Sequence, residues 1–341
     1  MSVGIVVGTR PEAVKLKPVV DELIRRMVPV FVIASGQHDL SEYGIIFDKK
    51  IDPSISKTLS LGEKTGVMIT ELSGIFERED LSSVIVQGDT ATVLAAAIAA
   101  HMTKIPVVHV EAGLRTGDLE CPYPEESVRQ MVSRIAALNC APTEMARREL
   151  LGENVSGKIV MTGNTIVDAL VNNGMEGAWP EGWRDSQTKI LVTCHRRENW
   201  GKRTEELVEA LMMIPHDVHV VLHPNPSARG PFNHIFSSCH ESISHREMVS
   251  AIKMADVVIT DSGGMAEEAA IMGTRTVIFR DKTERMEAVN SGVADLVPDA
   301  KMIPKAVEKM LKEGRMQGIS DFGDGTASTK IVNSMDLMGL L

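Results

Sequence analysis

Residues 84–110 have the sequence VIVQGDTATVLAAAIAAHMTKIPVVHV, in which two short β-branched runs flank a longer helical stretch. This pattern predicts strands at residues 84–87 and 107–110 and a helix at residues 90–101. The predicted strands are apolar on consecutive residues, as expected where helices cover both faces of a sheet. A strand, a helix and a second strand in this order form the repeating unit of parallel α/β architecture.

The same alternation continues along the chain. Further strands are predicted at residues 3–7, 30–34, 159–161, 190–193, 218–222, 257–260, 276–279 and 294–297. Further helices are predicted at residues 12–26, 204–213, 265–272 and 301–312. The periodicity is lost at residues 172–187, NNGMEGAWPEGWRDSQ, where Gly, Pro and polar residues cluster. We therefore predict an α/β protein of two doubly wound Rossmann-like domains that face a cleft, residues 1–170 and 171–323.

The composition supports this class and excludes several others. A chain of 341 residues is long enough for a core in each of two domains. Its net charge of −10 argues against a non-specific nucleic-acid binder and against a basic membrane-surface protein. The longest charge-free apolar stretch, residues 90–103, is too short to cross a membrane. The N-terminal sequence MSVGIVVGTR also lacks the basic region of a signal peptide.

The four cysteines are widely spaced and form no CxxC pair. This spacing fits a reducing cytoplasm better than a disulfide scaffold or a zinc site. We therefore expect a cytoplasmic protein that holds no metal.

Ligands of doubly wound domains bind at the carboxyl ends of the strands, so the loops that follow strands are the candidate sites. The first predicted strand continues into GTRPEAVK, residues 8–15. There, a helix N-terminus with Arg10 and Lys15 beside it suits an anionic group such as a diphosphate. The alternative is an ordinary helix start with solvated charges. The stretch is not GxGxxG, so it does not indicate a nicotinamide cofactor.

Three carboxylates follow neighbouring strands in the same half of the chain. Asp89 lies in QGDT, Glu111 in HVEAGLRTGD and Glu125 in PYPEE. Like charges at close quarters raise some pKa values and a nearby cation lowers others, so the group can supply both an acid and a base. The alternative is that each carboxylate only caps a helix or is solvated in a loop.

Two strand ends in the second half carry further candidates. His195, in CHRREN at residues 194–199, can titrate near neutral pH and contact a phosphate. Ser262, Gly263 and Gly264, in TDSGG, predict a cradle of backbone N–H groups for phosphate, with Glu268 one turn into the helix that follows. The alternative there is a tight turn with a glutamate that favours the helix dipole.

The ordered motifs GTRPEAVK, QGDTAT, HVEAGLRTGD, PYPEE, TGNTIVDAL, CHRREN and TDSGGMAEEA resemble those of the non-hydrolysing UDP-N-acetylglucosamine 2-epimerases. The likeness covers almost the whole chain. It implies a GT-B-type fold in which residues 324–341 cross back to the first domain. It also implies a homodimer that needs no cofactor and binds UDP-N-acetylglucosamine and UDP.

The resemblance further implies a role for each candidate residue. It assigns the acid and base work to Asp89, Glu111 and Glu125, without deciding which serves which face of the sugar, and the departure of UDP to Arg10, Lys15 and His195. It implies that the UDP portion contacts Ile243, Met248, Ser262, Gly263, Gly264, Glu268 and Arg285. Met248 stands where an aromatic residue often stacks on the base in this family.

The chemistry expected from the resemblance is elimination of UDP to 2-acetamidoglucal and its re-addition, because the C2 proton is not adjacent to a carbonyl. The product would feed the synthesis of surface polysaccharide or glycan. Four alternatives stay open: a C2 epimerase of a modified sugar such as a UDP-diacetamido uronic acid, a retaining glycosyltransferase, a hydrolysing enzyme, and a binding protein without turnover. Family members can also carry a second, activating nucleotide site, of which Gln37-His38-Asp39-Leu40 retains part.

Overall fold

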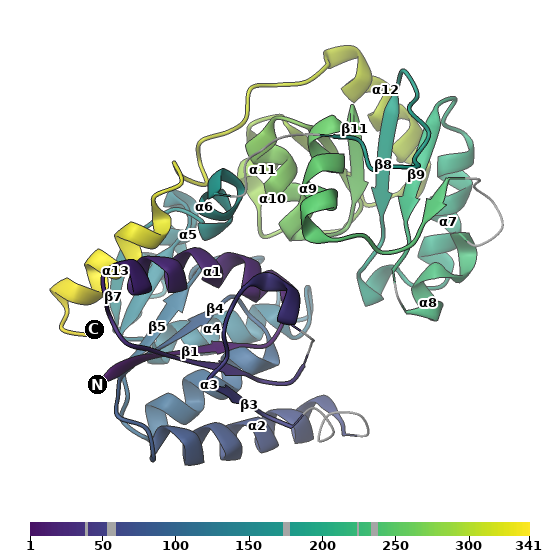
Figure 1. Ribbon diagram of the computed structural model, residues 1–341. Coiled ribbons are helices and arrows are strands. Elements are labelled where there is room, and N and C mark those ends of the chain that lie inside the picture. The colour runs from purple at the N-terminus through teal and green to yellow at the C-terminus, as the bar shows by residue number, and fades with distance from the viewer. Residues whose placement is uncertain (38–39, 53–58, 173–177, 224, 233–237) are drawn as a thin grey trace. The chain divides into compact units, whose positions relative to one another are not determined.

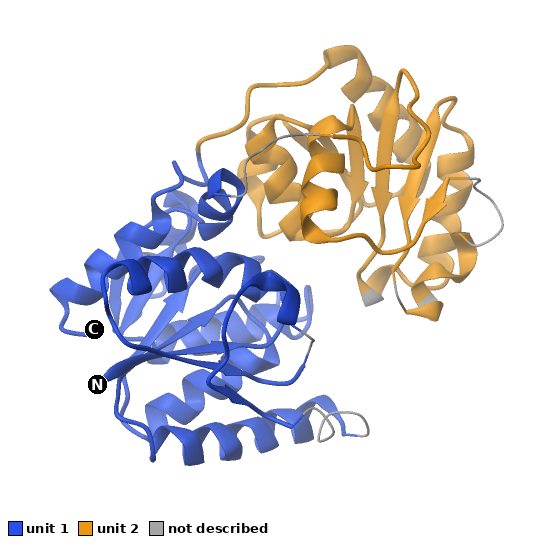
Figure 2. Ribbon diagram, in the orientation of Figure 1, with its two compact units in different colours: residues 1–172, 321–341 blue, residues 173–320 orange. Residues whose placement is uncertain are grey.

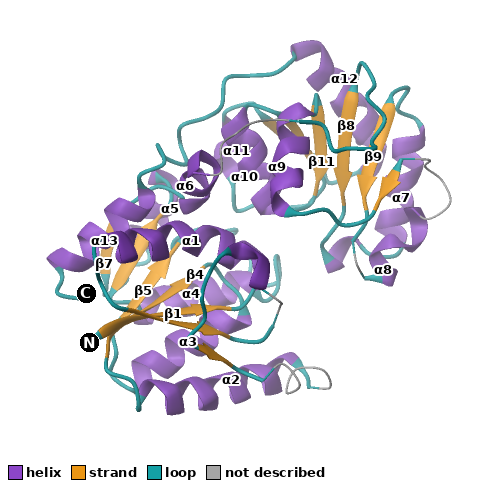
Figure 3. Cartoon of the chain, in the orientation of Figure 1, coloured by secondary structure: helices purple, strands orange, loops and turns teal. Residues whose placement is uncertain are grey.

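The computed structural model describes residues 1–341 apart from 38–39, 53–58, 173–177, 224 and 233–237. The chain divides into unit 1, residues Met1–Asn172 and Asp321–Leu341, and unit 2, residues Asn173–Ser320 (Figure 2). Helices and strands alternate in both units (Figure 3). None of the described helices has the length and apolar character needed to span a membrane.

In the described part of unit 1, seven parallel strands form the sheet, in the spatial order β3-β2-β1-β4-β5-β6-β7. They are β1 (Ser2–Val7), β2 (Val30–Ala34), β3 (Lys49–Lys50), β4 (Leu81–Gln87), β5 (Val107–Val110), β6 (Leu138–Ala141) and β7 (Lys158–Met161). Figure 1 labels β1, β3, β4, β5 and β7 of this sheet. The chain moves outward in one direction from β1 and in the other from β4. The topological switch point, where such sheets bind ligands, therefore lies between β1 and β4.

Helices cover both faces of this sheet. They are α1 (Arg10–Arg25), α2 (Leu61–Phe76), α3 (Ala91–Met102), α4 (Glu125–Ile135), α5 (Glu144–Gly152), α6 (Thr165–Asn172) and α13 (Ala327–Leu337). Successive residues of β1 point to opposite faces, so Ile5 packs in the core with α1 and α13 while Val6 packs in the core with α2 and α3. Burial on both faces explains why the strand is apolar at every position.

The C-terminal residues complete unit 1. Asp168 of α6 accepts hydrogen bonds from the backbone N–H groups of Ala327 and Ser328 at 3.1 and 2.8 Å, which satisfies the N-terminus of α13. Ser83 Oγ donates a 2.7 Å hydrogen bond to the carbonyl of Leu340. The last helix is thus anchored to β4 and to α6.

Six parallel strands form the sheet of unit 2, in the order β10-β9-β8-β11-β12-β13. They are β8 (Lys189–Thr193), β9 (Asp217–Val221), β10 (Cys239–His240), β11 (Val257–Thr260), β12 (Arg275–Ile278) and β13 (Ala294–Leu296). The helices are α7 (Lys202–Met212), α8 (Pro226–Arg229), α9 (His245–Met254), α10 (Gly263–Met272), α11 (Met286–Asn290) and α12 (Ile303–Glu313). Here the switch point lies between β8 and β11. The predicted class, α/β with two doubly wound parallel-sheet domains, is confirmed.

Candidate functional site

A buried glutamate links the two loops at the switch point of unit 1. Gly8 N donates to Glu12 Oε2 at 2.6 Å, and the hydroxyls of Thr9 and Thr90 donate to Glu12 Oε1 at 2.9 and 2.8 Å. Burial raises the pKa of Glu12 to about 7 against the opposing effect of these hydrogen bonds. Glu12 therefore joins the loop after β1 to the loop after β4, which carries Asp89. Glu12 was not among the residues predicted from the sequence.

Glu111 lies beside two donors from neighbouring elements. Lys15 Nζ of α1 donates to Glu111 Oε2 at 2.5 Å, and Gln87 Nε2 at the end of β4 donates to the same oxygen at 2.6 Å. Glu111 follows β5 directly and has a φ of +65°, a conformation that costs energy for a residue with a side chain. Such strain is kept where the surroundings fix the residue, and this position brings a carboxylate to the carboxyl edge of the sheet.

Asp89 is held by a buried arginine. Arg129 of α4 donates to Asp89 Oδ2 from Nε at 2.7 Å and also reaches Glu126 Oε2 from Nη1 at 3.2 Å. Glu126 in turn accepts the backbone N–H of Thr116 at 3.0 Å, which ties the irregular loop after Glu111 to α4. Arg129 and Glu126 are functional candidates that were not predicted from the sequence, where the neighbouring Glu125 was the predicted residue.

Glu125 and Arg10 occupy the starts of two helices in unit 1. Glu125 begins α4 and is half-buried. Arg10 begins α1 and is exposed, and its Nε lies 3.9 Å from Glu42 Oε1.

His109 on β5 supports the turn between β4 and Asp89. Its Nε2 donates to the Gly88 carbonyl at 2.8 Å, and burial lowers the pKa of His109 to about 4. A neutral imidazole thus supports the turn that precedes Asp89.

In unit 2, Asp261 organises the loop that carries His195. Asp261 follows β11, is buried, and accepts the backbone N–H groups of His195 and Arg196 at 2.8 and 2.9 Å. Asn199 Nδ2 donates to the same carboxylate at 2.9 Å. Burial lowers the pKa of His195, whose ring lies 5.4 Å from that of His223. Asp261 follows a strand just as Asp89 does, so the same sequence pattern that indicated Asp89 could also have indicated Asp261.

Cys194 is a poor nucleophile in this structure. Its side chain is buried, and burial raises the pKa of its thiol above the ordinary value. Its Sγ donates to Asp261 Oδ2 at 3.5 Å. A buried thiol that stays protonated is unreactive.

The TDSGG segment forms the N-terminus of α10 after β11. Ser262 is the N-cap and its Oγ accepts the N–H of Met265. A Cβ added at Gly263 would lie 2.5 Å from Arg285 Nη1. A Cβ added at Gly264 would lie 4.0 Å from its nearest neighbour, Ser262 Oγ. Gly263 therefore makes room for Arg285, and Gly264 leaves space beside the first turn of α10.

Arg285 is surrounded by carboxylates. Its Nε lies 2.9 Å from Glu267 Oε1, and its Nη1 forms an ion pair with Glu284. Glu284 also binds Arg280 Nη1 at 2.9 Å. The guanidinium is thus held in place by buried charges, which fixes the direction in which it can meet a ligand.

Glu268 is buried in α10 and lies 2.7 Å from His245 Nε2 at the start of α9. Ile243 and Met248 flank this start and are half-buried against the core around α9 and α10. The structure thus gathers the candidates of unit 2 around the starts of two adjacent helices. It gathers Lys15, Asp89 and Glu111 at the carboxyl edge of unit 1.

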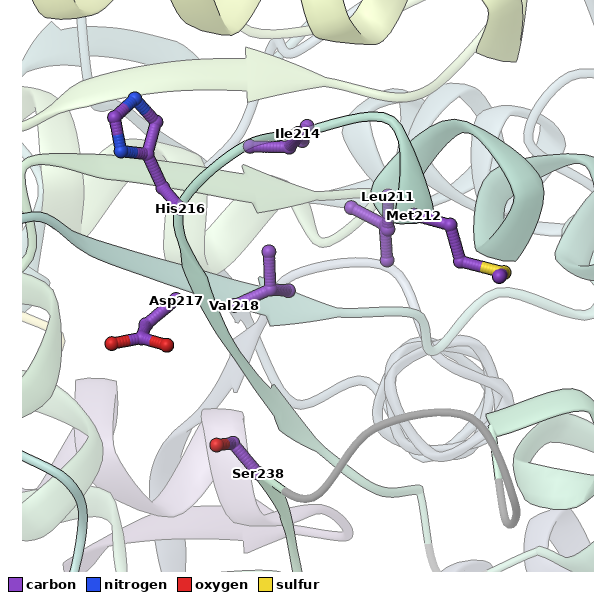
Figure 4. A pocket seen from close by; sticks show the side chains of 7 residues that line it. All are labelled: Leu211, Met212, Ile214, His216, Asp217, Val218 and Ser238. Atoms are coloured by element: carbon purple, nitrogen blue, oxygen red, sulfur yellow. The ribbon is translucent and has the colours of Figure 1, made fainter.

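A pocket of about 270 Å³ in unit 2 lies at the other end of the strands (Figure 4). Its walls are Leu211, Met212, Ile214, His216, Asp217, Val218 and Ser238. All of these residues except Ser238 precede or begin β9, and Ser238 precedes β10. His195 and Ser262 instead follow strands, so the pocket is separate from the candidate site. Among the residues that the structure describes, no group of three or more His, Cys, Asp and Glu could hold a metal ion. His38 and Asp39 of the proposed activating pattern lie outside the described residues.

Comparison with known proteins gives one consistent family. A family model described as UDP-N-acetylglucosamine 2-epimerase matches residues 17–336. The UDP-N-acetylglucosamine 2-epimerase of Escherichia coli K12 is 36% identical, and the match covers 98% of each chain. That of Neisseria meningitidis is 34% identical and covers 98% of this chain and 99% of the relative.

Solved structures agree with the sequence relatives. The Neisseria meningitidis UDP-GlcNAc 2-epimerase bound to UDP-GlcNAc superposes with a TM-score of 0.89 at 33% identity, covering 99% of this chain and 100% of the other. The Methanocaldococcus jannaschii enzyme in complex with UDP-GlcNAc and UDP gives 0.88 at 31%, with the same coverage. A spinosyn rhamnosyltransferase shares the fold alone, at a TM-score of 0.55 and 14% identity.

Proposed function

The chain belongs to the UDP-N-acetylglucosamine 2-epimerase family, and from this premise we propose that it interconverts UDP-N-acetylglucosamine and UDP-N-acetylmannosamine. The observation that supports the proposal best is the pair of charge-compensated carboxylates at the carboxyl edge of unit 1. Glu111 binds Lys15 and Gln87 there, and Asp89 binds Arg129. Acid and base groups at one edge of the sheet are what proton removal and return at one carbon require.

The reaction proceeds by elimination and re-addition. One carboxylate takes the C2 proton while the C1–O bond to the diphosphate breaks, which gives 2-acetamidoglucal and UDP. A proton then returns to C2 on the opposite face, and an oxygen of the β-phosphate re-forms the bond to C1. Asp89, Glu111 and Glu125 are the proposed acid and base groups.

Departure of UDP is assisted by cations and backbone N–H groups, which stabilise the charge on the leaving diphosphate. We assign this role to Arg10, Lys15 and His195. Lys15 also forms the buried ion pair with Glu111. In unit 2, the backbone at Ser262–Gly264, the Arg285 guanidinium and Glu268 bind the UDP portion, and Ile243 and Met248 contact uracil.

We further propose that residues 1–170 with 324–341 form the catalytic domain and that residues 171–323 form the UDP-binding domain. The protein acts as a cytoplasmic homodimer without a cofactor, and UDP-N-acetylmannosamine enters the synthesis of surface polysaccharide or glycan.

Incubation with UDP-N-acetylglucosamine in heavy water, read by proton NMR, tests the proposal. We expect UDP-N-acetylmannosamine to form and deuterium to enter C2 of both sugars without an acceptor. Free N-acetylmannosamine with UDP would instead indicate a hydrolysing enzyme. UDP binding without C2 exchange would indicate a glycosyltransferase, a binding protein or an epimerase of a modified sugar, and would contradict the proposal.

A further inference from the structure

His245 and Glu268 form a contact that the reaction described above does not use. His245 is the first residue of α9, and Ser244 before it forms a capping box with Glu247. Ser244 Oγ accepts the Glu247 N–H at 3.3 Å, and Ser244 N donates to Glu247 Oε2 at 2.9 Å. Because both ends of this cap are bonded, the backbone at His245 is fixed at the start of α9.

Glu268 is a buried carboxylate whose hydrogen-bond partner is His245. Its side chain is only 7% exposed, and it is the sixth residue of α10, beyond the reach of the unpaired N–H groups of the first turn. The neighbouring Arg285 is engaged by Glu267 and Glu284 instead. A buried carboxylate without a partner is costly, so the imidazole 2.7 Å away is its main compensation.

The imidazole binds one oxygen of Glu268. His245 Nε2 lies next to Oε1, and no other hydrogen bond to Glu268 is made by the residues that the structure describes. Burial by itself would lower the pKa of His245, but the hydrogen bond and the charge of Glu268 raise it above its usual value. The contact thus places a donor at Nε2 against Oε1 and leaves Oε2 of Glu268 available as an acceptor.

We propose that His245 is a positioning residue for nucleotide recognition: it orients Glu268 so that Oε2 accepts hydrogen bonds from the ribose hydroxyls of a uridine nucleotide. The inference rests on the proposed function, because it takes UDP as the ligand of unit 2. It adds a determinant of ribose specificity on α9, a helix separate from the TDSGG segment.

Calorimetric titration with UDP and with 2′,3′-dideoxy-UDP separates this role from a structural one. The wild-type chain should bind UDP at least about tenfold more tightly than the dideoxy nucleotide, the scale of a hydrogen bond to a charged group. His245→Phe should weaken UDP binding about tenfold and leave dideoxy-UDP binding within about twofold. His245→Gln, whose amide can still donate at the position of Nε2, should keep most of the preference.

Two further variants complete the experiment. Arg246→Gln changes an exposed neighbour on the same helix and should leave both affinities unchanged. Glu268→Gln should remove the preference, and adding His245→Phe to it should cause no further loss, because the two residues act together.

The outcomes are distinguishable. Equal weakening of both nucleotides by His245→Phe, no weakening of either, or a wild-type chain that does not discriminate between them would overturn the inference and leave the proposed function intact. Absence of UDP binding by the wild-type chain would overturn the proposed function itself.

Discussion

Lys15 Nζ lies 2.5 Å from Glu111 Oε2, and the two side chains, 96 residues apart in sequence, are 7% and 5% exposed. Removing one member of a buried pair leaves an uncompensated charge, which costs about 3–5 kcal/mol. We therefore expect Lys15→Met to lower the free energy of unfolding by about 3 kcal/mol in urea titrations. Adding Glu111→Gln should recover part of this loss, because the double variant buries no net charge.

Lys17 provides the matched control for this prediction. It lies on the same helix and pairs with Asp21 at 2.6 Å, but both side chains are partly exposed. Lys17→Met should cost no more than about 0.5 kcal/mol, as for other exposed pairs one turn apart. If Lys15→Met lowered the free energy of unfolding as little as Lys17→Met, the buried pair would not be needed for stability.

Replacement of the acid and base groups should separate binding from turnover. We expect Asp89→Asn or Glu111→Gln to retain UDP binding and to lower turnover at least about a hundredfold, the usual scale for such groups. Coupled assays of UDP-N-acetylmannosamine formation and UDP titrations measure the two effects. Glu71→Gln, which changes an exposed carboxylate on α2, is the control. Near-normal turnover in both active-site variants would contradict the assignment.

The adjacent glycines Gly263 and Gly264 should differ in how their replacement by alanine changes thermal stability. Gly263→Ala places a methyl group 2.5 Å from Arg285 Nη1, so the guanidinium must shift, and we expect both thermal stability and UDP affinity to fall. Gly264→Ala meets no atom closer than 4.0 Å, and alanine is favoured over glycine within a helix by about 0.5–1 kcal/mol. We expect Gly264→Ala to keep or raise the melting temperature and to weaken UDP binding. Unchanged UDP affinity in Gly264→Ala would exclude the phosphate from this helix start.

Glu12 should make the stability of the protein depend on pH. Its folded pKa of about 7 exceeds the ordinary value of 4.5, so the folded chain holds the proton more tightly than the unfolded chain. The resulting stabilisation is complete below about pH 4.5 and is lost as the pH rises through about 7. The stability advantage of the wild type over Glu12→Gln should therefore shrink by up to about 3 kcal/mol between pH 4.5 and pH 8.

Glu22 on the same helix has the opposite behaviour and serves as the control. The hydrogen bond from Arg25 lowers its pKa to about 2, so its stabilisation is present above pH 4.5 and is lost only as the pH falls toward 2. The difference between wild type and Glu22→Gln should be constant between pH 5 and pH 8. If the stability difference between wild type and Glu12→Gln is also constant between pH 5 and pH 8, then Glu12 is ionised in the folded protein over that whole range, and the prediction is wrong.

Most strands could be predicted because burial on both faces makes them continuously apolar. The predicted limits of β2, β5 and β11 coincide with those in the structure. Strand β6 was not predicted, because Asn139 interrupts its apolar run; that residue is buried and its amide donates to the Ser133 carbonyl. The edge strands β3 and β10 have two residues each, which is too short for any periodicity to indicate.

The candidate site was predicted less completely, because its geometry depends on long-range contacts. The position of Glu111 after a strand indicated a functional carboxylate, but no local pattern could indicate that Lys15 would bind it. The pair Glu125–Glu126 shows a second limit. Spacing alone does not distinguish two adjacent glutamates, and the structure buries Glu126 against Arg129 while Glu125 begins the helix.

Unit 2 is inserted into unit 1, because residues 321–341 return to the first sheet after unit 2 has ended. Ile331, Val332 and Met335 fill the core between α13 and α1, so that core stays incomplete while the ribosome is still making the middle of the chain. The first unit to begin translation is thus the last to be finished. Residues 173–320 are one contiguous segment, whereas unit 1 consists of two separated pieces that a new linker would have to join in any version without unit 2.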